Sequence, residues 1–148
     1  MSEQESLKFK ISLSGTYWDK RPQCSIWLDE HCAIQTEVTD KIHVFEFERT
    51  VDAGLHALKI RLDNKDKSDT VLVNNEITQD LLLNIHDIEI EEISLGPLIW
   101  DATYILDQPQ SYHGKTITQL DRCVNLGWNG TYLLNFNSPF YLWLLEKL

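Results

Sequence analysis

The chain has 148 residues, 43% of them hydrophobic and 24% charged, which is typical of a globular protein and predicts one domain over residues 1–148. Lys and Arg number 13 against 23 Asp and Glu, and the formal net charge of −10 repels phosphate backbones, so nucleic acid is excluded as a partner. The sequence contains no run of about 18 apolar residues, so we expect no membrane partner either.

The N-terminal segment and the cysteines indicate the cellular compartment. The opening MSEQESLKFK lacks the apolar core of a secretion signal. Cys24, Cys32 and Cys123 are odd in number and form no CxxC pair, which argues against a disulfide framework and favours reduced, buried thiols. We therefore expect synthesis in a cytosol.

Alternating apolar and polar residues predict several strands in the first part of the chain. Residues 1–6 are polar and are expected to form a flexible tail. The predicted strands cover residues 7–13, 24–28, 32–39 and 41–51. Asp29-Glu30-His31 is typical of a hairpin turn, and Asp52-Ala53-Gly54 predicts a hairpin between the fourth strand and the next one, 55–62.

The stretch 55–93 organises the chain. Its two strand-like runs, 55–62 and 80–91, flank a loop rich in side-chain oxygen, 63–79. In the second run the apolar residues change phase, from Leu81, Leu83 and Ile85 to Ile88 and Ile90. One extra residue in a strand reverses its faces, so the pattern predicts a β-bulge near His86-Asp87.

The last third is less regular. Pro97 marks an edge or a break in the run 95–100, and residues 101–125 predict an irregular loop region with room for a short strand. Asn129-Gly130 is a hairpin signal before a strand at 131–136. The segment 138–148 fits a helix, because Ser138-Pro139 resembles a helix start, and equally a strand, because its apolar residues alternate.

Short strands separated by turn signals predict an all-β fold, an antiparallel jelly-roll-like β-sandwich with either a short helix or a strand at the C-terminus. The sequence lacks GxSxG, GxxxxGK[ST] and GxGxxG, and its five histidines have no zinc-site spacing. We therefore predict no catalytic residues. A carboxylate pair for glycan cleavage is the alternative, although the sequence singles out no pair.

The loop 63–79 offers candidate metal ligands. Asp63 and Asp80 stand at its two ends and could hold Ca²⁺ if the flanking strands meet at one end of the sandwich. Lys65, Lys67 and Ser68 break the spacing of an EF-hand loop, and a solvated loop without metal is the alternative.

Aromatic residues in loop contexts form a candidate ligand or partner surface. Tyr17, Trp18 and Trp128, with Asn129 beside the last, suit sugar stacking or a protein interface. The alternative is that these rings cover the ends of the sandwich.

Residues 9–93 resemble small calcium-dependent xylan-binding modules at the level of the fold. The likeness is carried by Leu62-Asp63-Asn64, the loop that follows, and the run of strand residues 80–90. It implies a jelly-roll sandwich and Ca²⁺ held by Asp63, Asn64 and Asp80. The Asp-Asn order is the reverse of the family's, and Leu82 and Asn84 replace an asparagine and an aromatic residue. The resemblance therefore supports the sandwich more than the calcium site.

A second resemblance is to small proteins of large tailed phages, in residues 11–18 (ISLSGTYW) and 138–145. It implies a virion component made in the host cytosol, with Phe140, Tyr141 and Trp143 as an assembly segment that contacts other virion proteins or a second copy. We predict a non-catalytic, carbohydrate-binding-module-like component of a tailed-phage virion. A free-standing Ca²⁺-dependent glycan-binding module is the alternative.

Overall fold

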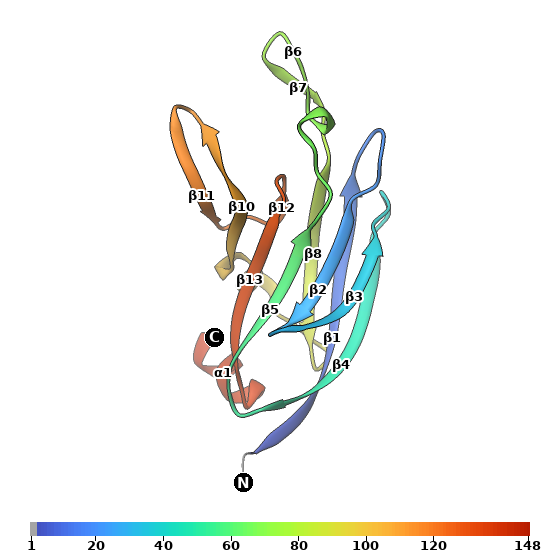
Figure 1. Cartoon of the computed structure of the whole chain (residues 1–148). Helices are drawn as coiled ribbons and strands as arrows, with labels where there is room; N and C mark the ends of the chain where they lie inside the picture. The colour runs from blue at the N-terminus through green and yellow to red at the C-terminus, as the bar shows by residue number, and fades with distance from the viewer. Residues whose placement is uncertain (1–2) are drawn as a thin grey trace.

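Two antiparallel sheets stack into a β-sandwich, which confirms the all-β class (Figure 1). The structure is a computed structural model of the chain, and it describes residues 3–148 apart from the side chain of Tyr112. Met1 and Ser2, part of the expected tail, lie outside the described residues. Within the described chain, no helix is both long and apolar enough to cross a membrane.

The first sheet has the strand order β12-β8-β1-β4, with β9 paired to β8. Its strands are β1 (Gln4–Thr16), β4 (His43–Asp52), β8 (Leu82–Ile90), β9 (Ile93–Ser94) and β12 (Asn125–Leu126). Because β1 begins at Gln4, which pairs with Asp52 of β4, residues 4–6 belong to the sheet and not to a loose tail.

The second sheet has the order β11-β10-β13-β5-β2-β3. Its strands are β2 (Gln23–Leu28), β3 (His31–Glu37), β5 (Gly54–Leu62), β10 (Thr103–Tyr112), β11 (Lys115–Asp121) and β13 (Gly130–Ser138). The predicted hairpin across Asp29-Glu30 is confirmed, because β2 and β3 pair around it.

The core lies between the sheets and follows the alternation of the sequence. Leu7, Phe9, Ile11 and Leu13 of β1 are fully buried, as are the inward residues Leu58, Ile60 and Leu62 of β5. The rings of Phe9 and Phe136, one from each sheet, lie 6.0 Å apart between centroids. Burial of these apolar side chains is the main force that holds the two sheets together.

The phase change in β8 is a bulge, as predicted. Ser12 of β1 pairs with Asp87, whereas the next residue, Leu13, pairs with Ile85, so His86 is the extra residue. The bulge lets Leu83 and Ile85 as well as Ile88 and Ile90 face the core. His86 turns away from the core, where its Nε2 lies 2.6 Å from the Ser14 hydroxyl.

Two turns that were predicted to close hairpins connect the two sheets instead. The turn 52–54 joins β4 of the first sheet to β5 of the second, and residues 127–129 join β12 to β13. Position 130 does not adopt a positive φ, so its backbone conformation does not require glycine. Glycine is required there because a Cβ would collide with the carbonyl of Ile105 on β10.

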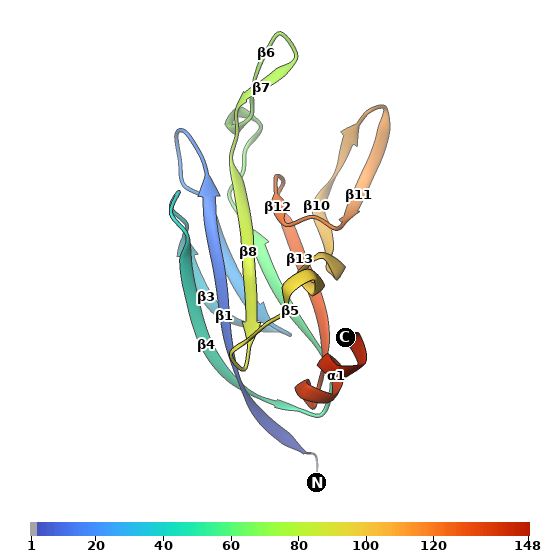
Figure 2. The ribbon, with the colours of Figure 1, turned by 180° about the vertical axis from the view of Figure 1, so that it is seen from behind.

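Two segments expected to be loops contain hairpins. Residues 63–79 hold the 3-10 helix η1 (Lys67–Asp69), β6 (Val71–Val73) and β7 (Glu76–Gln79), and the region 101–125 holds the β10–β11 hairpin. Both hairpins extend from the end of the sandwich opposite the N-terminus (Figures 1 and 2). Most of their residues are exposed on both faces, so their sequences lack the alternation that marks a half-buried strand.

The remaining elements cover one side of the core. Pro97 lies at the start of the 3-10 helix η2 (Gly96–Asp101), and the C-terminal segment forms the helix α1 (Phe140–Lys147). The α1 side chains Phe140 and Trp143 pack on Phe136, with ring centroids 6.5 Å and 6.2 Å away. The helical alternative for residues 138–148 is therefore confirmed.

The three cysteines are free thiols in different environments. Cys24 is buried and Cys123 is half-buried, whereas Cys32 is exposed on β3, contrary to the expectation that all three are buried. Cys32 lies in β3, the outermost strand of its sheet, where its side chain is exposed.

Candidate functional site

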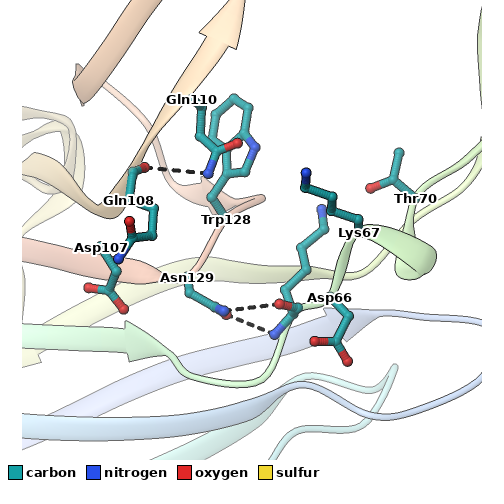
Figure 3. Close-up of a pocket in the computed structure, with 9 residues that line it drawn as sticks. Asp66, Lys67, Thr70, Asp107, Gln108, Gln110, Trp128 and Asn129 are labelled. Carbon is teal, nitrogen blue, oxygen red and sulfur yellow. Dashed lines mark hydrogen bonds between the residues drawn. The ribbon is translucent and has the colours of Figure 1, made fainter.

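The two projecting hairpins extend from one end of the sandwich (Figure 1). A pocket of about 530 Å³ lies at this end, and Figure 3 shows the residues that line it. One wall comes from β10, a second from the segment after β5 that includes η1, and the third from the link between β12 and β13. The lining residues are Lys65, Asp66, Lys67, Thr70, Asp107, Gln108, Gln110, Trp128 and Asn129. Its volume lies within the range of small-molecule sites.

A wide bulge in β10 creates the first wall. Ile105 pairs with Gln119 of β11, and the next pair joins Gln110 to Ile117, so four residues of β10 stand opposite one of β11. Asp107 and Gln108 lie in this bulge and line the pocket. A bulge re-aims side chains next to a site, and here it does so for both residues.

Arg61 of β5 fixes the bulge from outside the pocket. Its guanidinium donates to both carboxylate oxygens of Asp107, at 2.7 and 3.2 Å, and to the hydroxyl of Thr131. The hydrogen bond to Asp107 raises the pKa of Arg61 against the opposing effect of burial. Asp107 is therefore tied into a bidentate ion pair, and Gln108 is the bulge side chain left for a ligand.

Trp128 and Asn129 form the third wall. Trp128 is held through its backbone, and Asn129 is held through its side-chain amide. The hydroxyl of Tyr104 accepts a hydrogen bond from the Trp128 N–H at 3.0 Å and donates to the Trp128 carbonyl. The Asn129 amide accepts from the Lys65 N–H at 2.7 Å and donates to the Lys65 carbonyl at 3.0 Å (Figure 3). Asn129 therefore holds the loop, and the Trp128 ring is the aromatic surface of the pocket.

The wall around η1 is stabilised by local hydrogen bonds. The buried carboxylate of Asp69 accepts from the Asp66 N–H at 2.7 Å, and the Trp18 indole donates to the Asp69 carbonyl at 2.9 Å. Lys20 pairs with Asp66 at 2.6 Å and with Asp69 at 3.1 Å. Among the described residues, Lys67 has no ion-pair partner, so its ammonium is available to a ligand.

The three candidate calcium ligands do not converge on one point. Asp63 accepts hydrogen bonds from Ser25 and Arg61, at 2.8 and 3.0 Å. The Asn64 amide oxygen accepts from the Gln23 N–H at 2.8 Å. These oxygens face three different donors of the β2–β5 region, so they are not free to bind a cation together.

Asp80 binds a cation of a different kind, the ammonium of Lys65. The Lys65 Nζ lies 2.6 Å from the Asp80 carboxylate and 2.6 Å from the Gly127 carbonyl. Thr70 and the Leu81 N–H also donate to Asp80, at 2.7 and 2.8 Å. Burial alone would raise the pKa of Asp80, but these hydrogen bonds outweigh it and lower the pKa.

Asp63, Asn64 and Asp80 are thus held by different protein donors and are not arranged to bind Ca²⁺ together. In the part of the chain that the structure describes, no group of three His, Cys, Asp or Glu side chains could hold a metal ion. Ca²⁺ takes about six to eight oxygen ligands in proteins. The set Asp63, Asn64 and Asp80 does not fit this ion.

The other predicted site residues are divided between pocket, loop and core. Trp128 and Asn129 line the pocket, whereas Trp18 supports its wall through Asp69 and half-buried Tyr17 is outside the lining. In the predicted assembly segment, Phe140 and Trp143 are buried in the core and Tyr141 is exposed.

Sequence reasoning missed most of the pocket. Gln108 and Gln110 lie in the region expected to be irregular, and only their position on a bulged strand gives them a role. In the sequence, Lys65 and Lys67 indicate only that the loop is not an EF-hand. A lysine between two potential calcium ligands could have indicated an internal cation.

The fold is similar to that of known calcium-dependent carbohydrate-binding modules. No protein-family model matches the sequence, and no curated protein does so. A structure of vCBM60 in complex with galactobiose has a TM-score of 0.58 and 7% identity, with 86% of this chain and 98% of that chain covered.

A second structure of vCBM60 is described as linking two families of calcium-dependent carbohydrate-binding modules by circular permutation. It has a TM-score of 0.60 and 8% identity, with 86% of this chain and 89% of that chain covered. At such low identity the likeness shows the fold, and the function must be argued from the site.

Proposed function

We propose that this protein is a non-catalytic glycan-binding module, and that its binding site is the pocket around Trp128. The observation that carries the proposal is an indole ring beside polar amides and a free ammonium in one pocket, on a fold similar to carbohydrate-binding modules. The neighbour with galactobiose supports a short oligosaccharide as the ligand class.

The pocket has the chemistry that a sugar requires. A pyranose presents an apolar face of C–H groups, which packs on an aromatic ring, and a rim of hydroxyls, which need hydrogen-bond partners. Trp128 supplies the ring. Gln108 and Gln110 supply amides that donate and accept, and Lys67 supplies a donor.

The carboxylates of the pocket support binding without turnover. Glycoside hydrolysis uses two carboxyl groups that flank the bond, one as acid and one as base or nucleophile. Here Asp66 is paired with Lys20, and Asp107 with Arg61. Both carboxylates serve to position the walls, so neither is available as a catalytic group.

Replacing the indole tests the proposed site. We expect galactobiose or a longer oligosaccharide to bind in titration calorimetry, and Trp128→Ala to weaken binding at least tenfold, about 1.4 kcal/mol. Trp100→Ala is the control, because Trp100 is an exposed tryptophan that lies on η2, outside the pocket lining. A glycan array without any signal, or equal affinity of Trp128→Ala and the native chain, would refute the proposal.

A role in a tailed-phage particle, made in the host cytosol, is the second candidate, and the outer face of α1 supports it. Leu142 and Leu145 are 60% and 66% exposed, and Tyr141 lies beside them in sequence with half of its surface exposed. Exposed apolar side chains gathered on one helix favour a protein partner.

Two substitutions that introduce charge on that face test the particle role. We expect Leu142→Glu with Leu145→Glu to leave the melting temperature unchanged, because both side chains face solvent, and to prevent incorporation into particles. Mass spectrometry of purified virions measures the incorporation. Normal incorporation of this double variant, or absence of the native chain from virions, would contradict the particle role.

A further inference from the structure

The ammonium of Lys65 occupies an enclosed position in the wall of the pocket. The Lys65 side chain is 9% exposed and the Asp80 side chain 18% exposed. A Cβ on Gly127 would lie 4.0 Å from the Lys65 Nζ, which shows how closely this part of the chain passes the ammonium. A lysine charge so far from solvent is rare unless it is paired.

This one charge joins three separate segments of the chain. Lys65 follows β5, Asp80 precedes β8, and Gly127 lies between β12 and β13. The ammonium contacts Asp80 and Gly127, while the Lys65 backbone pairs with the Asn129 amide. The walls that carry Lys67 and Trp128 are therefore fastened to each other through Lys65.

The position also excludes a second cation. The two oxygens nearest the ammonium, one from Asp80 and one from Gly127, already lie 2.6 Å from it. A Ca²⁺ ion at Asp80 would meet too few oxygens and the like charge of the lysine.

We infer that Lys65 is an internal cation which performs the cross-linking that a bound Ca²⁺ could otherwise provide, so that the pocket is assembled without metal. For ligand binding the inference rests on the proposed function, since it implies that glycan affinity is independent of Ca²⁺. Lys65 and Asp80 are positioning residues, because they shape the walls rather than contact the sugar.

The first test measures the metal dependence of the native chain. We expect the melting temperature to be the same in EDTA and in millimolar CaCl₂, whereas an ion bound well above its dissociation constant would raise it by about 5 °C or more. Such a rise, or a fall in EDTA, would overturn the inference. This measurement needs no glycan, so it remains decisive if the proposed function fails.

The second test isolates the charge pair. Lys65→Met and Asp80→Leu each leave one buried charge without its partner, and we expect each to lower the melting temperature by about 5 °C or more. The double variant removes both charges and should recover part of that loss. Lys59→Met is the matched control, because Lys59 pairs at 3.4 Å with Glu30, whose side chain is 92% exposed.

The double variant and the glycan titrations decide between the possible outcomes. If the losses in melting temperature of the two single variants simply add in the double variant, the ion pair does not hold the walls together and the inference is wrong. If the inference is right, the glycan affinity measured by calorimetry falls in Lys65→Met, returns in part in the double variant, and does not change with EDTA in the native chain. A native chain that binds glycan only with Ca²⁺ would overturn the inference while sparing the proposed function.

Discussion

His56 is a residue whose charge state is set by the fold. Its Nδ1 lies 2.7 Å from the Asp29 carboxylate and its Nε2 2.6 Å from the Asp52 carbonyl, so both nitrogens face acceptors. Only the protonated ring can donate from both nitrogens. Burial lowers the pKa of His56, but the hydrogen bonds to Asp52 and Asp29 together raise it above the ordinary value.

This arrangement predicts a pH dependence of stability. A pKa raised in the folded state gives a contribution that is fully present below about pH 6.5 and is lost as the pH rises through the folded pKa. We expect the free energy of unfolding measured in urea to fall as the pH rises from about 6 to about 9. His56→Gln should lack this fall, and exposed His31→Gln should retain it; equal pH profiles for all three chains would contradict the prediction.

The calcium ligands show where residue-level reasoning reached its limit. The sequence placed Asp63 and Asn64 in the polar loop and Asp80 at the start of the strand that follows it. It did not indicate what each oxygen contacts. Asp63 is bonded to Arg61, only two residues away, and Asp80 to Lys65. A count of oxygens along a chain omits the cations that the fold brings to them, and here these cations decide the chemistry.

At the scale of elements, strands that alternate against the core were predictable. The strand β5 and the bulge at His86 in β8 follow from residues that must face one side, because a single extra residue is the simplest way to reverse the faces within one strand. The β10–β11 hairpin was not predictable in this way. Beyond Leu106 its residues are largely exposed, so burial imposes no period on the sequence.

The connections between elements were the second feature that the sequence could not predict. A turn such as Asp52-Ala53-Gly54 has the same local chemistry whether the next strand pairs with the last or crosses to the other sheet. The choice is made by pairing far away, because β5 lies between β13 and β2. The pocket depends on such choices, since β10 and the β12–β13 link form two of its walls.

At the scale of the whole molecule, the two sheets are expected to unfold together. The chain passes repeatedly from one sheet to the other, so β1 pairs with β4 and β8, and β5 pairs with β2 and β13. Neither sheet is a continuous stretch of chain that could form alone, and the two share one apolar core.

This topology predicts a single cooperative transition. Ile11→Val in the first sheet and Ile60→Val in the second each remove one methylene from a fully buried site, at a cost of about 1 kcal/mol. In urea we expect tryptophan fluorescence and far-ultraviolet circular dichroism to give coincident transitions for the native chain and for both variants, with lower midpoints in the variants and unchanged slopes. If one variant shifted one signal and left the other in place, the sheets would be separate folding units. The pocket, whose walls include β10 of the second sheet and the β12–β13 link between the sheets, would then lose the rigid frame on which the proposed binding depends.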